Sequence, residues 1–205
     1  SFLKGGELSS IIKARGPLPS NKVLITFDDG YADTAREFFP EIENLQVPIV
    51  VFLPVFYIGK VNSWDGKQEK IVSGTDISYW SSKNVEFGLH SYSHRNYSEM
   101  SSKMGGDTGW ADIRNDLKAC IAGLRGLNVN LVRAFAYPYG GIHRSPDDKQ
   151  KMSDVLQDSG ITWSVRIGNR INDCTKYNAH YLQRIDVRGD EDFETFVRKF
   201  RRGRW

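Results

Sequence analysis

Two adjacent carboxylates, Asp28 and Asp29, follow an apolar run and precede Gly30. Neighbouring side chains at the end of a strand point in different directions, so one carboxylate can bind a metal ion while the other stays free as a base. Gly30 allows a sharp turn because it has no Cβ atom. A solvated Asp-Asp-Gly turn explains the same residues, and the motif taken alone favours that interpretation because such turns are common.

Two histidines, His90 and His94, directly follow a later apolar run. Side chains four residues apart lie on one face if the segment is helical, close enough to share one ion. The chain has only 4 histidines, so this pairing favours a metal site over two unrelated surface residues. One carboxylate and two imidazoles leave positions open on a divalent ion, which is the pattern of a catalytic metal site.

A third cluster begins with Arg133, inside an apolar run that stops at Pro138. An arginine in a buried strand is costly unless a carboxylate meets it, and we expect Asp28 to be that partner at the same end of the sheet. Pro138 and the glycines after it make a rigid turn that can aim the Tyr139 backbone N–H into a pocket. A structural salt bridge and an ordinary turn are the alternative.

The segments TFDDG, HSYSH and RAFAYPYGG together resemble, in order and spacing, the first three motifs of a known family. These are the polysaccharide deacetylases, the NodB-homology group also called carbohydrate esterase family four. The resemblance covers about residues 20 to 190, and the NSWD segment and residues 168–170 and 184–187 are similar to bacterial exopolysaccharide or poly-N-acetylglucosamine deacetylases. It implies an α/β fold, a distorted (β/α) barrel that often has fewer than eight strands.

The resemblance also implies a role for each matched residue. Asp28 is the general base, Arg133 holds and tunes it, and the Tyr139 backbone N–H faces the developing oxyanion. Three residues bind a divalent metal, usually zinc: Asp29, His90 and His94. The implied enzyme is a hydrolase of carbon–nitrogen bonds in linear amides. It removes acetyl groups, N-acetyl before O-acetyl, from a polysaccharide or oligosaccharide, with metal-bound water as nucleophile. A catalytically weak metal- and carbohydrate-binding module with the same fold is the alternative.

The histidine that the family uses as general acid, in its fifth motif, is missing from this sequence. His143, in a polar loop, and His180, before a strand, are two replacements. The third is a histidine on a strand before Ser1, as in a circularly permuted subgroup that residues 7–12 resemble, and we favour this one. The fourth motif is also blurred: Trp163 either fills its packing role or is an ordinary core residue.

Short apolar runs alternate with amphipathic helical segments along the whole chain, which predicts parallel strands connected by helices. We expect strands at residues 22–27, 48–53, 85–89, 133–137, 162–167 and 181–187. Helices are expected at residues 34–45, 76–80, 111–124, 148–157 and 191–200, the second capped by Asp76 and the last with Phe193 facing inward. Function gathers at the carboxyl ends of parallel strands, so the three motifs should meet there.

The composition limits the other classes of function. The length of 205 residues fits one domain over residues 1–205, with the option that a strand precedes Ser1. A net charge of +3 is too small to indicate nucleic acid binding, and 2 cysteines are too few for a disulfide framework. No apolar run reaches the roughly 18 residues of a membrane span. A cell-envelope or extracytoplasmic location is slightly favoured over a cytoplasmic one, and the sequence leaves the oligomeric state open.

Overall fold

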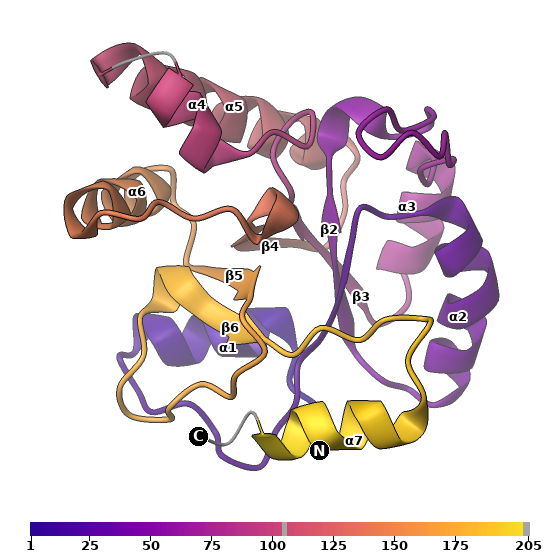
Figure 1. Cartoon of the computed structure of the whole chain (residues 1–205). Helices are drawn as coiled ribbons and strands as arrows, with labels where there is room; N and C mark the ends of the chain where they lie inside the picture. The colour runs from indigo at the N-terminus through magenta and orange to yellow at the C-terminus, as the bar shows by residue number, and fades with distance from the viewer. Residues whose placement is uncertain (104–105, 203–205) are drawn as a thin grey trace.

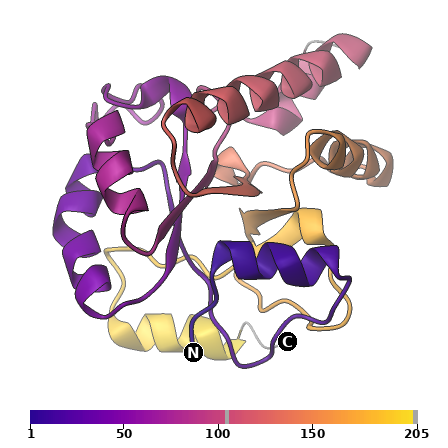
Figure 2. The ribbon, with the colours of Figure 1, turned by 180° about the vertical axis from the view of Figure 1, so that it is seen from behind.

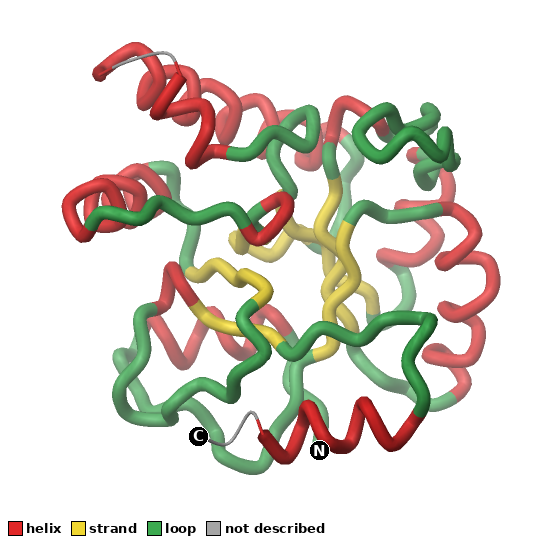
Figure 3. The backbone as a smooth tube through the Cα atoms, viewed as in Figure 1, coloured by secondary structure: helices red, strands yellow, loops and turns green. Residues whose placement is uncertain are grey.

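The computed structural model describes residues 1–103 and 106–202 and contains one sheet of parallel strands. The strands follow one another across the sheet in chain order, β1 to β6 (Figure 1). Their bounds are β1 Ile25–Asp28, β2 Ile49–Leu53, β3 Val85–Leu89, β4 Leu131–Ala136, β5 Trp163–Ile167 and β6 Leu182–Arg184. Figure 3 shows these strands at the centre of the molecule, with helices and loops around them.

The sheet curls into a half-barrel that brings its two edge strands together. Arg184, the last residue of β6, donates hydrogen bonds to Thr26 and Asp28 of β1. These contacts link strands that stand at opposite ends of the strand order. The predicted distorted barrel with fewer than eight strands is therefore confirmed.

α-Helices connect the successive strands from β1 to β5, α1 precedes β1, α7 follows β6, and the connection from β5 to β6 contains only a 3-10 turn. The helices are α1 Gly5–Lys13, α2 Ala32–Asn44, α3 Gly74–Ser81, α4 Tyr97–Lys103, α5 Gly106–Gly126, α6 Pro146–Asp158 and α7 Phe193–Arg202. Short 3-10 turns lie at Val55–Tyr57, Pro138–Gly140 and Ala179–Tyr181. None of the helices in the described ranges combines the length and the apolar composition that crossing a bilayer would require.

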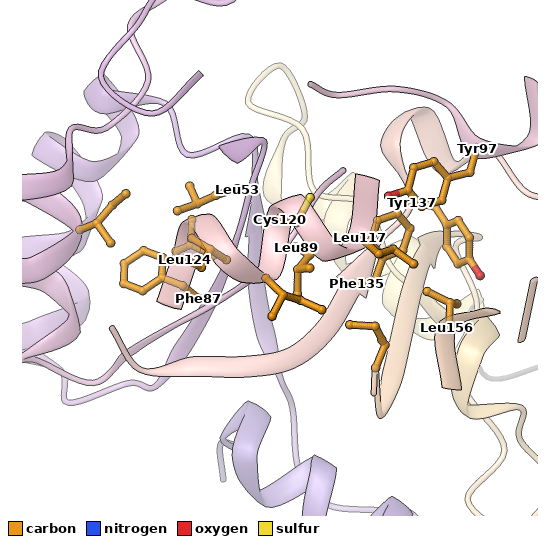
Figure 4. Close-up of a cluster of buried hydrophobic side chains, with 14 of the residues drawn as sticks. Leu53, Phe87, Leu89, Tyr97, Leu117, Cys120, Leu124, Phe135, Tyr137 and Leu156 are labelled. Atoms are coloured by element: carbon orange, nitrogen blue, oxygen red, sulfur yellow. The ribbon is translucent and has the colours of Figure 1, made fainter. Parts of the chain in front are cut away.

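The larger core fills the space between the sheet and the helices on its convex side (Figure 4). Alternate residues of the strands, such as Leu53, Leu89 and Phe135, pack there against Leu117 of α5 and Leu156 of α6. All five side chains are fully buried. Burial of this apolar surface, worth about 25 cal/mol per Å², fixes which face of each strand points outward.

The smaller core lies inside the curl, where α1 covers the strands (Figure 2). Leu8 of α1 packs with Phe52 and Trp163, and the Trp163 indole N–H donates to the Ser9 hydroxyl at 2.9 Å. The Glu86 carboxylate of β3 accepts the first backbone N–H groups of α1, at 2.5 and 2.8 Å. An anion at a helix N-terminus is favourable, so α1 is held against the concave face.

Most predicted elements match the structure within a few residues, and three details differ. Ser73 caps α3, while Asp76 stands three residues later and completes a capping box. Helix α4 was not predicted, because its seven residues, YSEMSSK, carry no long apolar period. Phe193 of α7 is 77% exposed rather than inward-facing, because the amphipathic face of α7 is not part of either core.

Candidate active site

The first motif ends β1 and turns its two carboxylates apart. Asp28 is the last strand residue, and Asp29 and Gly30 both have left-handed backbone conformations, with φ of 68° and 72°. A Cβ atom at Gly30 would lie 2.2 Å from a methyl group of Leu53, so only glycine fits beside β2. This turn sends the Asp29 side chain toward β3, whereas Asp28 remains on the face of the strand.

The second motif follows β3, at the same edge of the sheet. Asp28 is in register with Phe52, and Phe52 with Gly88, so His90 begins close to the end of β1. The segment from His90 to His94 is a turn, not the helix on which the predicted spacing argument relied. Left-handed conformations at Ser91 and His94, with φ of 54° and 57°, bring the two imidazoles together, with ring centroids 4.8 Å apart.

Asp29, His90 and His94 converge as the sequence predicts. The Asp29 Oδ1 atom lies 3.3 Å from His90 Nε2 and 3.1 Å from His94 Nε2, and one ligand atom from each residue falls within 4.8 Å of the others. Both imidazoles are buried. Such strained backbone next to converging polar groups is typical of functional sites.

The donor set fits a divalent metal ion. His90 Nδ1 lies 2.8 Å from the carbonyl of Ala136, so Nδ1 carries the proton and Nε2 presents a lone pair to Asp29. Asp29 Oδ1 is buried and has no hydrogen-bond partner among the described residues. Lone pairs that face one another in a buried site repel unless a cation lies between them, and one carboxylate with two imidazoles suits zinc.

The local environment favours the unprotonated form of Asp29 and His94 but not of His90. Burial alone would raise the pKa of Asp29, but the two imidazoles lower it well below its ordinary value. Burial lowers the pKa of His94. Burial acts in the same direction on His90, yet the carboxylates of Asp28 and Asp29 raise its pKa overall. A divalent ion in place of a proton would satisfy the same two carboxylates.

The predicted pairing of Asp28 with Arg133 is wrong, and Arg184 is the partner. Its guanidinium binds both oxygens of Asp28, at 2.7 and 2.5 Å, and lies over the Phe52 ring inside the curl. Burial opposes the charge of Asp28, but the Arg184 charge and the nearby His90 lower the pKa of Asp28 below its ordinary value. The sequence signal for Arg184 was its place inside the last predicted strand, residues 181–187.

Arg133 points to the opposite side of the sheet because side chains alternate along a strand. Its neighbours Val132 and Ala134 belong to the inner core, so Arg133 faces outward. There it donates to the carbonyls of Ser159, at 2.8 Å, and Gly160, at 3.2 Å, beyond the end of α6. A cation at a helix C-terminus is favourable, which gives Arg133 a structural role and removes it from the site.

Tyr139 lies in the turn after β4, beside the histidines. Its φ is 58°, and its ring meets His94 edge-on at 4.6 Å between centroids. The turn's own backbone hydrogen bonds, from Gly140 to Tyr137 and from Gly141 to Pro138, do not use the Tyr139 N–H. Tyr139 is 59% exposed, so the residue borders the surface beside Asp29, His90 and His94.

An aromatic wall completes the site on the side of the loop after β2. The Trp64 indole stacks on His94 with ring centroids 4.3 Å apart and an interplanar angle of 24°, and Tyr57 packs edge-on against Trp64. Asn62 is buried and donates to Asp65 at 2.9 Å, which folds the NSWD loop into place. This wall fixes the orientation of the His94 ring.

His143 and His180 both have structural contacts away from the convergent ligands. His180 precedes β6, at the amino end of the strands, and its Nε2 lies 3.2 Å from the Ile161 carbonyl. His143 is buried, stacks on Trp110 and lies 2.7 Å from the Ser101 hydroxyl. Burial lowers the pKa of both histidines.

Trp163 is a core residue. It is fully buried in the inner core and meets Phe52 edge-on at 5.9 Å. The interpretation as a core strand residue is therefore the one that the structure bears out, and its indole supports the Phe52 ring on which Arg184 lies.

Comparisons with known proteins define the family. A family model described as polysaccharide deacetylase matches residues 15–157, more than half of the chain. The chain belongs to the polysaccharide deacetylase family, as its three motifs predict, and is an enzyme of that class. No curated protein matches the sequence significantly.

Several solved structures share the fold. IcaB from Ammonifex degensii has 23% identity and a TM-score of 0.72, with 93% of this chain and 78% of that chain covered. A de-N-acetylase from Aggregatibacter actinomycetemcomitans has 15% identity, a TM-score of 0.72, and coverage of 97% and 82%. The BpsB deacetylase domain from Bordetella bronchiseptica has 20% identity, a TM-score of 0.65, and coverage of 88% and 78%. At these identities the likeness shows a shared fold.

Proposed function

We propose that the protein removes N-acetyl groups from an acetylated polysaccharide or oligosaccharide. The observation that carries this proposal is the different environment of two neighbouring carboxylates. Asp29 faces two imidazole nitrogens, while Asp28 is held by Arg184. One carboxylate is thereby available as a metal ligand and the other as a base.

Three residues would hold a divalent metal, which we propose to be zinc: Asp29, His90 and His94. A zinc ion at such a site supplies Lewis acidity toward the acetyl carbonyl and toward water. The Ala136 carbonyl fixes the His90 tautomer, and the Trp64 ring fixes the plane of His94. Both contacts hold the imidazoles in their ligand geometry before substrate arrives.

Asp28 is the proposed general base. Arg184 keeps its carboxylate ionised at neutral pH and orients both oxygens, so Asp28 can accept a proton from the attacking water. The Tyr139 backbone N–H is the proposed donor to the oxyanion that forms as the carbonyl is attacked. Its left-handed conformation and its place beside His94 support this assignment.

The catalytically weak metal- and carbohydrate-binding module remains the second candidate because of the two other histidines. His143 and His180 are engaged with Ser101 and Ile161, so neither supplies an evident general acid for the leaving amine. We keep a cell-envelope location as a prediction, in agreement with a polysaccharide substrate.

Acetate release from chito-oligosaccharides and from a poly-N-acetylglucosamine oligomer separates the two candidates. The full-length protein, including any residues before Ser1, is assayed after chelation and after zinc is restored. We expect release only with metal, and loss of release in Asp28→Asn with zinc binding retained. Zinc and sugar binding without acetate release from any of these substrates would favour the binding module.

A further inference from the structure

A carboxylate outside the three motifs contacts the turn that carries both histidines. Asp116 stands on α5, and its Oδ1 atom accepts the Tyr92 backbone N–H at 2.7 Å and the Tyr97 hydroxyl at 2.6 Å. The Cys120 thiol, one turn further along α5, lies 3.6 Å from the same oxygen. Three donors therefore meet one oxygen of a half-buried carboxylate.

The position of Tyr92 gives this contact its importance. Tyr92 is two residues after His90 and two residues before His94, so its N–H lies at the midpoint of the metal-binding turn. Ser91 and His94 are both left-handed, a conformation that costs of order 1 to 3 kcal/mol and persists only where the surroundings enforce it. A fixed acceptor at Tyr92 is such a constraint.

The acceptor itself is rigidly held. The Tyr97 side chain is fully buried and stacks on Phe135 at 4.9 Å between centroids, and Figure 4 shows its ring in the same core as Cys120 and Phe135. Because Tyr97 and Tyr92 share one oxygen of Asp116, the turn is tied to the core rather than to a mobile surface group.

We propose that Asp116 is a positioning residue for the metal site, which holds the turn from His90 to His94 so that both Nε2 atoms face Asp29. The inference rests on the proposed metal site. Asp116 itself lies outside the three motifs. It touches neither imidazole and acts through the backbone N–H of Tyr92. What it requires is an acceptor oxygen at one place, not a negative charge.

Three substitutions of Asp116 test this requirement by zinc calorimetry on the full chain. Asp116→Asn keeps an oxygen in place but removes the charge, and we expect a zinc Kd within a few-fold of the parent. Asp116→Glu keeps the charge but moves the oxygen by one methylene, and Asp116→Ala removes the acceptor. Loss of such an outer contact typically weakens metal affinity about 10- to 100-fold. We expect a loss of this size in Asp116→Glu and in Asp116→Ala.

Asp112→Ala is the matched control, because Asp112 lies one turn earlier on α5 and makes neither tyrosine contact. It should bind zinc as the parent does. If Asp116→Ala does not fold, the pair of Asn and Glu variants still decides the question. Parental zinc affinity in Asp116→Glu, or an equal loss in Asp116→Asn, would overturn the positioning role. A parent that binds no zinc at Asp29 would instead refute the proposed function itself.

Discussion

The ion pair between Arg184 and Asp28 should contribute more to stability and to catalysis than any contact of Arg133. We compare Arg184→Gln with Arg133→Gln, because both variants replace an arginine of the same sheet by glutamine. Removing one partner of a buried ion pair costs about 3 to 5 kcal/mol. The Asp28 and Arg184 side chains are 26% and 15% exposed, so solvent reduces the expected loss to about 2 kcal/mol.

The control variant, Arg133→Gln, should lose less free energy of unfolding than Arg184→Gln. Arg133 donates to two carbonyls near the end of α6, and loss of such contacts is worth about 1 kcal/mol. Urea unfolding in the presence of a chelator measures both free energies of unfolding without a contribution from bound metal. An equal loss in the two variants, or a larger loss in Arg133→Gln, would refute the assignment of Arg184 as the partner of Asp28.

The pH dependence has a definite sign. Arg184 lowers the pKa of Asp28 in the folded protein, so the stabilisation is fully present above the ordinary Asp pKa of about 4 and is lost as the pH falls further. The stability difference between Arg184→Gln and the parent should therefore shrink in acid. In the acetate-release assay, removal of Arg184 raises the pKa of the base, so the acid limb of kcat/KM should move to higher pH. An unmoved acid limb would argue against Asp28 as the base.

Four further substitutions probe other parts of the account. Gly30→Ala places a methyl group against Leu53 at a left-handed position, so urea unfolding should show a loss of about 2 kcal/mol or more. Leu117→Ala empties part of the convex core and should cost about 2 to 5 kcal/mol in the same assay. Trp64→Leu removes the ring that stacks on His94, and calorimetry should report weaker zinc binding in a protein of parental stability. His180→Gln should leave kcat for acetate release within a few-fold of the parent, because His180 lies at the amino end of the strands; a loss of several hundred-fold would make it the general acid.

The convergence of Asp29, His90 and His94 could be predicted from sequence because the Asp28–Asp29 pair and His90 directly follow apolar runs. Parallel strands end at one edge, so Asp29 and His90 had to meet there. His90 and His94 lie together as predicted, even though their turn is not helical. The spacing alone did not reveal that the left-handed backbone at Ser91 and His94 brings the two imidazoles together.

The partner of Asp28 could not be predicted, because it depends on how strongly the sheet curls. Arg133 and Arg184 are both arginines in apolar strands, and only the alternation of faces in β4 directs Arg133 outward. Arg184 reaches Asp28 only because β6 curls back to β1. Asp116 was missed for a related reason: it looks like an ordinary polar position on an amphipathic helix, and its acceptor role comes from the tertiary contact with Tyr92.

The most direct test of the account is a zinc titration of two neighbouring variants, Asp29→Asn and Asp28→Asn. The parent and Asp28→Asn should each bind one zinc ion with similar affinity. Asp29→Asn, which replaces the carboxylate that faces both imidazoles, should lose at least about 100-fold in affinity. Unchanged zinc binding in Asp29→Asn, or its loss in Asp28→Asn alone, would contradict the assignment of one carboxylate to the metal and the other to the base.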